Sequence, residues 1–421
     1  LFEGDPVERY NTIVLRCMYG DSWMSSSGGT YLRELWAHET QRALGHVGLY
    51  GRLVHVYLNG LYWGLYTAIE RPDDAFAADH IAPPRENWDV LAGLITAAEV
   101  ELKEGSRQAY NAMMALVPKS PTTTVSDVTY AQLEQYLDMP LFADYMLLQL
   151  YSQNYDWPNK NWRLIAQRNP ANPAGPPLVK FRYFVWDQES TLGFYGQDRT
   201  TIGDNIAEMR GPAQIYKRIR GHHKFKRLFG DRAHKHMFNG GALTTVSNTE
   251  RWVALMSNAH AAIVGESARW GDIVNPATPI TRDPFPPNQT MSWYSTMDKV
   301  LNVNWFSFRN NYFLNSLRNA GLYPRIDAPT FSQFGGQVTN GYRLGMSVPS
   351  GTIYYTTNDH DPANLDDSVG ATAVAYSGPV PLTGNVRIKA RAKSGSVWSA
   401  LTEAVFIVGR PPVRITELMY N

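Results

Sequence analysis

The stretch of sequence that decides the fold of this chain is QNYDWPNKN, at residues 153–161. An apolar helix is predicted over Asp144–Ser152, and it ends at this polar segment. The segment presents Asp156 on a loop, and Asn161 follows after four intervening residues. An acid and an amide on one rigid loop can serve one reaction, the acid as proton acceptor and the amide as metal ligand.

A second acidic segment, FVWDQE, lies at residues 184–189 and places Asp187 at the end of an apolar strand. Protein kinases use the same Asp-x-x-x-x-Asn spacing in their catalytic loop, with a further Asp as metal ligand. Magnesium prefers one or two carboxylates with phosphate oxygens and water, a requirement that Asp187 and Asn161 meet. Glu189 points to the same face in a strand register and is expected to help bind a second ion.

The segments around these two motifs predict a mixed fold. Asn59-Gly60 is a strong hairpin signal between strands predicted at 53–58 and 64–69. A strand is predicted at 12–15 and a helix after Thr30, with Gly45 as its C-cap. Further elements are predicted downstream: a strand pair at 162–166 and 178–186, helices within 212–270, and a last helix near 299–319.

The composition changes after Pro324, where helix signals give way to short alternating strands. Strands are predicted at 351–357, 386–392 and 401–408, a pattern typical of a small antiparallel sandwich. We therefore predict an α+β chain with a small all-β sandwich near its C-terminus, divided as 1–324, 325–409 and 410–421.

Three blocks in order, residues 56–70, 153–161 and 186–193, resemble the spore coat protein H (CotH) kinases, which are atypical secreted protein kinases. The resemblance covers about residues 1–320. It implies an atypical protein-kinase-like fold that uses ATP and Mg²⁺. It also implies Asp156 as the catalytic residue, with Asp187 and Asn161 as metal ligands.

The same resemblance suggests two cofactor-binding residues. Arg33 lies early in the predicted helix, where family members tend to have an Arg, and is the best phosphate cation within the chain. Glu70 ends the hairpin block and is expected to orient a cation, as the αC Glu does in ordinary kinases. The family usually has an Asp where this chain has Glu189, and its Lys-rich strand is expected before Leu1, so we expect the chain to be a fragment.

Two further resemblances lie near the C-terminus. Residues 353–359, 376–382 and 388–392 look like the Ig-like C-terminal domain of chitobiases and β-hexosaminidases. Residues 414–421 look like the opening strand of a lamin-tail-type domain. Both resemblances imply a secreted or cell-surface bacterial protein, with association to a cell surface or polysaccharide as a further expectation.

Composition excludes some classes of protein. A formal net charge of +1 argues against a broad nucleic-acid-binding surface. The sequence contains no run of about 18 apolar residues, so no membrane span is predicted. With Cys17 as the only cysteine, neither an intramolecular disulfide nor a Cys-based zinc site can form. Four histidines at 222, 223, 234 and 236 have Lys and Arg neighbours, which favour a solvated basic helix face over a metal site.

The function expected from these observations is Mg²⁺- and ATP-dependent phosphoryl transfer to a Ser or Thr of an extracellular or coat protein. One alternative is a catalytically inactive surface-binding or coat-assembly protein that keeps the kinase fold. A less favoured alternative is a polysaccharide-active protein that uses Asp156 and Asp187 as paired carboxylates. Purely structural interpretations also exist, with Asp156 as a turn former and Arg33 paired with Glu34 or Glu70.

Overall fold

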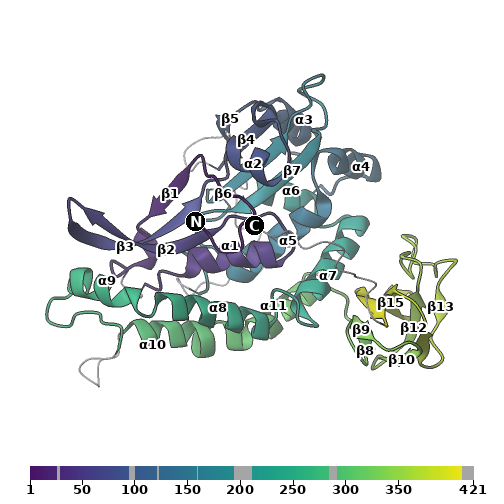
Figure 1. The fold of residues 1–421 in the computed structure, drawn as a ribbon. Coiled ribbons are helices and arrows are strands. Elements are labelled where there is room, and N and C mark those ends of the chain that lie inside the picture. The colour runs from purple at the N-terminus through teal and green to yellow at the C-terminus, as the bar shows by residue number, and fades with distance from the viewer. Residues whose placement is uncertain are drawn as a thin grey trace, which may run out of the picture. The chain divides into compact units, whose positions relative to one another are not determined.

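The computed structural model describes residues 1–25, 29–93, 100–120, 123–158, 160–193, 211–283 and 292–409. Helices and sheets alternate through most of the chain and an all-β region follows, which confirms the predicted α+β class (Figure 1). The chain divides into two compact units. The first holds Leu1–Lys226 and Gly240–Leu317, and the second holds Arg227–Asn239 with Arg318 onward.

The first unit begins with a three-stranded antiparallel sheet in the order β1-β3-β2. Its strands are β1 (Ile13–Arg16), β2 (Gly51–Leu58) and β3 (Leu61–Glu70). The predicted hairpin is confirmed, because the two-residue turn has φ 49° at Asn59 and 80° at Gly60, as a type I′ turn requires. The second strand starts earlier than the predicted Gly64, since pairing with β2 already begins at the turn.

A four-stranded antiparallel sheet follows in the order β5-β4-β6-β7. Its strands are β4 (Trp88–Ala92), β5 (Glu101–Glu104), β6 (Trp162–Gln167) and β7 (Val179–Val185). The β6–β7 pair confirms the strand pair predicted at 162–166 and 178–186. All five residues of β4 are buried, consistent with its place inside the sheet.

Two buried helices form the centre of the first unit. Helix α5 (Met139–Ser152) is buried along most of its length, because apolar side chains surround it on every face. It begins earlier than predicted, at a cap in which Asp138 Oδ1 accepts a hydrogen bond from Leu141 N at 3.2 Å. Helix α1 (Arg33–Ala43) packs against α5, β2, β7 and α8, and Gly45 follows it with φ 91°, as predicted for a C-terminal glycine.

The remaining helices follow in chain order. They are α2 (Asp74–His80), α3 (Gln108–Leu116), α4 (Asp127–Tyr136), α6 (Pro212–Ile219), α7 (His223–Met237), α8 (Thr245–Ala259), α9 (Ala262–Trp270), α10 (Trp293–Asp298) and α11 (Phe306–Asn319). The last predicted helix therefore begins later than residue 299, because a π-helical segment, Lys299–Asn304, intervenes. Within the described ranges, no helix combines the length and apolarity that crossing a bilayer requires.

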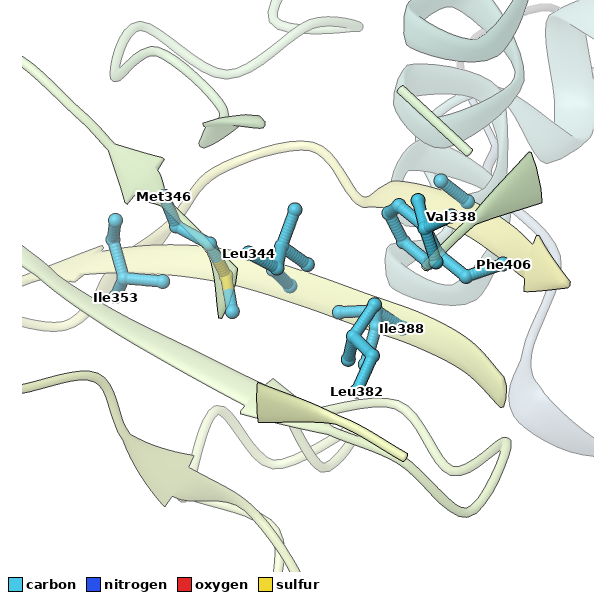
Figure 2. Close-up of a cluster of buried hydrophobic side chains, with 9 residues drawn as sticks. Val338, Leu344, Met346, Ile353, Leu382, Ile388 and Phe406 are labelled. Carbon is cyan, nitrogen blue, oxygen red and sulfur yellow. The ribbon is translucent and has the colours of Figure 1, made fainter. Parts of the chain in front are cut away.

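The second unit contains short strands around an apolar core, as the strand pattern after Pro324 predicts. Its main sheet has the order β13-β12-β15-β17-β9, with β16 paired to β15 and only β9–β17 parallel. Figure 2 shows the core side chains, which include Leu344, Ile388 and Phe406. The strands are β8 (Thr330–Phe331), β9 (Gly336–Val338), β10 (Tyr342–Leu344), β11 (Met346–Ser347), β12 (Thr352–Thr356), β13 (Val374–Ala375), β14 (Val380–Leu382), β15 (Val386–Ser394), β16 (Val397–Trp398) and β17 (Thr402–Val408).

One buried ion-pair network also stabilises the second unit. The Arg391 side chain is 1% exposed, and its guanidinium donates to Asp231 of α7 and to Asp361, each at 2.6 Å from Nη2. Burial alone would lower the pKa of Arg391, but the two carboxylates together raise it above its ordinary value. The two acidic partners satisfy the buried guanidinium, which would be an unpaired buried charge without them.

Candidate active site

The loop that carries Asp156 is held against the segment that follows β7. Helix α5 ends at Ser152, and the next residue, Gln153, has a left-handed backbone with φ 54°. Two backbone hydrogen bonds then join the loops, from Tyr155 N to Ser190 O at 3.0 Å and from Leu192 N to Ser152 O at 2.9 Å. The loop that carries Asp156 is therefore held in place by the residues that directly follow Glu189.

Asn161 and Asp187 meet directly. Asn161 Nδ2 donates to the main-chain oxygen of Asp187 at 3.0 Å, and Asn154 Nδ2 donates to the same oxygen at 3.3 Å. Both Asn161 and Asp187 have left-handed backbones, with φ 65° and 56°. Such conformations are uncommon outside glycine and concentrate at functional sites, where the surrounding structure holds them.

Arg16, the last residue of β1, joins the two acids of the second motif. Its Nη2 lies 2.5 Å from Asp187 Oδ1 and 2.8 Å from Glu189 Oε1. The other Glu189 oxygen accepts a hydrogen bond from Gly20 N at 2.5 Å. Asp187 and Glu189 therefore share one cation, and the acids face the β1 strand that the sequence does not mark as functional.

Burial weakens the acidity of both carboxyl groups. It raises the pKa of Asp187, with the nearby Glu34 charge adding to the effect and Arg16 opposing it. It likewise raises the pKa of Glu189, against the effect of Arg16. A bound cation favours the ionised form of each acid, so this site is electrostatically suited to a positive ligand.

A second arginine, Arg163 of β6, adds positive charge beside these acids. The guanidinium groups of Arg16 and Arg163 lie over the ring of Trp186, with 5.4 Å and 4.7 Å from each Cζ to the ring centroid. Burial, together with the nearby Arg71 and Arg16 charges, lowers the pKa of Arg163 to about 10. Arg163 therefore remains protonated at neutral pH and adds a second positive charge near Asp187.

Glu34 of α1 fixes the backbone of Asp187 and Gln188. Its buried carboxylate accepts hydrogen bonds from Asp187 N at 3.0 Å and from Gln188 N, and His38 Nε2 lies 2.9 Å from Oε1. Burial alone would raise its pKa, but the Arg16 charge and the hydrogen bonds from His38 and Gln188 lower it to about 2. Glu34 is thus a permanent anion that orients residues 187 and 188.

Asp156 is partly exposed and has a cationic neighbour. Lys160 Nζ lies 3.2 Å from Asp156 Oδ2, and the two side chains are about one third exposed. The Lys160 charge also lowers the pKa of Asp187, although burial outweighs it. A carboxylate in this position is accessible to a hydroxyl substrate and can accept its proton.

The two predicted cofactor-binding residues lie in different surroundings. Arg33 is buried, and its guanidinium donates to Asp21 and, at 3.0 Å, to Thr191 O, so it orders the segment after Glu189. Glu70 is the last residue of β3, where it accepts a hydrogen bond from Tyr50 N at 2.8 Å and contacts His80 Nε2 at 2.8 Å. The described contacts do not bring Glu70 to Asp187, and a direct nucleotide contact by either residue stays a prediction.

The donor set of the site fits magnesium. Asp187, Glu189 and Asn161 offer carboxylate and amide oxygens, the hard ligands that Mg²⁺ prefers. Within the described part of the chain, no donor reaches Asp187 Oδ2, and Asn161 uses its Nδ2 rather than its Oδ1 for the protein contact. Asp187 Oδ2 and Asn161 Oδ1 can therefore bind a metal ion without breaking a hydrogen bond. Asp187 Oδ1 and Glu189 Oε1 would first have to lose their contact with Arg16.

Sequence reasoning missed Arg16 and Glu34. Arg16 reaches the acids because β1 pairs with β3, with Arg16 opposite Thr67. Glu34 reaches them because α1 packs against β7. Neither residue belongs to a spaced motif, and both contacts join segments more than 150 positions apart in the sequence.

Two family models match this chain. One, described as CotH kinase protein, covers residues 2–278, and the other, described as Fn3 associated, covers residues 343–400. A comparison with curated proteins finds no match.

Proposed function

The chain belongs to the CotH kinase family, since the family match spans well over half of its length, and we propose that it transfers the γ-phosphate of ATP to a Ser or Thr hydroxyl of a protein. The three sequence blocks predicted this family, and the match confirms it. We further propose that the first unit is an atypical protein-kinase domain and that the acceptor is an extracellular or coat protein.

In this proposal Asp156 positions the acceptor hydroxyl and takes its proton. Asp187 and Asn161 would hold Mg²⁺, with Glu189 as a further ligand, and the metal would neutralise charge on the phosphates. Arg16 and Arg163 would provide positive charge for the phosphate oxygens. Glu34 keeps residues 187 and 188 in place through its two backbone hydrogen bonds.

The observation that carries the proposal is the meeting of Asn161 with Asp187 at 3.0 Å, next to the loop that holds Asp156. Phosphoryl transfer depends mainly on positioning and charge stabilisation, so a base and metal ligands on interlocked loops are what the reaction needs. The left-handed backbones of Asn161 and Asp187 support a functional reason for this geometry.

Transfer of labelled γ-phosphate tests the proposal. The protein is incubated with γ-labelled ATP, Mg²⁺ and a library of Ser- and Thr-containing peptides, and incorporated label is counted. We expect incorporation that EDTA abolishes and that Asp156→Asn lowers by about 100-fold or more, as for loss of a general base, while nucleotide binding persists. Equal incorporation by Asp156→Asn would contradict the role assigned to Asp156.

The Arg16 contacts favour one alternative. Because Arg16 already neutralises Asp187 and Glu189, a protein that only binds a partner could keep the folded site without turnover. Nucleotide binding without any label transfer would support this surface-binding or coat-assembly function over catalysis.

The C-terminal module supports a multidomain protein. The Fn3-associated match lies within the sandwich of the second unit, and we propose that this module serves attachment in a secreted or cell-surface protein. The chitobiase-type resemblance stays a prediction, and the lamin-tail-type strand at 414–421 lies outside the described residues.

A further inference from the structure

One pair of the histidines noted in the sequence meets a carboxylate at a place unrelated to the candidate active site. His222 Nε2 lies 2.9 Å from Asp127 Oδ1, and His223 Nδ1 lies 3.7 Å from the same oxygen. One ligand atom from each of the three residues lies within 4.8 Å of the other two. This cluster joins the first residue of α4 to the first residue of α7 and the residue before it, within the first unit.

The other two histidines of the group behave differently. His234 Nδ1 lies 2.9 Å from Tyr323 Oη and Nε2 lies 3.1 Å from Thr402 Oγ1, so both ring nitrogens have protein partners. His236 Nε2 lies 3.2 Å from an Arg232 nitrogen, a neighbour that repels cations. The predicted solvated basic face is therefore wrong for His234 and His236, because both side chains are buried. Of the four histidines only His223 is exposed.

The spacing of the cluster suits a transition-metal ion. Zinc bonds of about 2.0–2.1 Å in a tetrahedron put ligand atoms about 3.4 Å apart, and the two measured distances lie on either side of that value. Two imidazoles with one carboxylate form a donor set of intermediate softness, which suits Zn²⁺ and disfavours Mg²⁺ and Ca²⁺.

The cluster is held in place by contacts that do not involve its own ligand atoms. Val125 N donates to Arg218 O at 3.1 Å, and Arg218 donates from Nε to Pro118 O at 2.8 Å. Gly221 passes so close to Thr124 that a Cβ there would lie 2.6 Å from Thr124 Oγ1. The two segments that supply the ligands are thus docked on each other already, which lowers the cost of ordering them around an ion.

The ring of His222 is also oriented in advance. It is buried and stacks on Tyr130 with 4.2 Å between ring centroids and 2° between planes. Its Nδ1 is buried without a hydrogen-bond partner among the described residues.

We propose that Asp127, His222 and His223 form a Zn²⁺-binding site that clamps the start of α4 to the start of α7. The fourth coordination position faces solvent, because Asp127 and His223 are more than half exposed. Lys224 adds positive charge beside the site, so we expect binding weaker than at a closed four-ligand zinc site. This inference does not depend on kinase activity.

The test is calorimetric titration of Zn²⁺ into tag-free, EDTA-treated protein that is then returned to excess Mg²⁺, which occupies oxygen-donor sites. Asp127→Asn and His223→Asn change exposed side chains and should leave the fold intact. We expect one Zn²⁺ per chain in the parent protein and at least about tenfold weaker binding in each variant, since even changes beyond the ligand shell typically cost 10–100-fold. His360→Asn, which changes an exposed histidine elsewhere, serves as the matched control and should bind like the parent.

Two further readouts identify the ligands. Co²⁺ in place of Zn²⁺ should give visible absorption bands of a tetrahedral site with nitrogen ligands, absent from both variants. Zn²⁺ should also raise the melting temperature of the parent protein and not that of the variants. Absence of Zn²⁺ binding to the parent protein, or equal binding by the parent and both variants, would overturn the proposal.

Discussion

Replacing Glu34 by Gln should destabilise the first unit in a way that depends on pH. Glu34 is fully buried, and its carboxylate receives the backbone N–H groups of Asp187 and Gln188. The pKa of Glu34 falls from 4.5 to about 2 in the folded protein. At neutral pH this difference corresponds to about 3 kcal/mol of stability, which the neutral Gln cannot supply.

The sign of the pH dependence follows from the lowered pKa. Because Glu34 is more acidic folded than unfolded, its contribution is complete above about pH 5.5 and declines as the pH falls toward 2. Between pH 7 and pH 3 the stability gap between parent and variant should therefore narrow by about 2 kcal/mol. Any conflict between the Gln amide and a backbone N–H is independent of pH and stays in the remaining gap.

Urea unfolding followed by tryptophan fluorescence measures this gap for the first unit, which holds every tryptophan except Trp398. Glu250→Gln makes the same chemical change at an exposed position of α8 and should alter stability by less than about 0.5 kcal/mol at any pH. A Glu34→Gln protein as stable as the parent, or a gap that does not change with pH, would refute the assigned role of Glu34.

Two further predictions concern arginines. Arg391→Ala should cost the second unit about 3–5 kcal/mol, because it removes a buried guanidinium and leaves two partly buried acids unpaired. Arg387→Ala, which removes an exposed pair, should cost less than about 1 kcal/mol in urea unfolding; equal losses would contradict the network. Arg16→Met removes a charge that lowers the pKa values of Asp187 and Glu189. The pH at which Mg²⁺-dependent nucleotide binding is half lost should therefore rise, and an unchanged or lower midpoint in binding titrations from pH 5 to 8 would count against this.

Local signals in the sequence predicted much of the fold. Asn59-Gly60 predicted the hairpin because a type I′ turn needs two residues with positive φ. The strands after Pro324 were predicted from alternating residues and turns. The start of α5 was misplaced by five residues, since the cap at Asp138 lies before the apolar run that was taken as the helix. The π-helical segment at Lys299–Asn304 has no comparable local signal.

The candidate site was predictable only as far as its residues lie in motifs. Asn161 and Asp187 were correctly predicted to lie close together. Asn161 directly precedes β6 and Asp187 closely follows β7, and these two strand ends are paired. Arg33 was predicted to be the phosphate-binding cation from its place in a helix. In the structure its guanidinium donates hydrogen bonds to Asp21 and to the Thr191 carbonyl. Contacts such as those of Arg16 depend on long-range pairing that no local pattern reports.

Calorimetric titration of ATP into the protein tests the central claim most directly, with Mg²⁺, with EDTA in its place, and with Asp187→Ala in Mg²⁺. Asp272→Ala, an acid-to-alanine change at an exposed position, provides the control. The account predicts binding that requires Mg²⁺, is lost in Asp187→Ala and is retained in Asp272→Ala. Binding of equal strength without Mg²⁺ or with Asp187→Ala, or no binding to the parent protein, would contradict it.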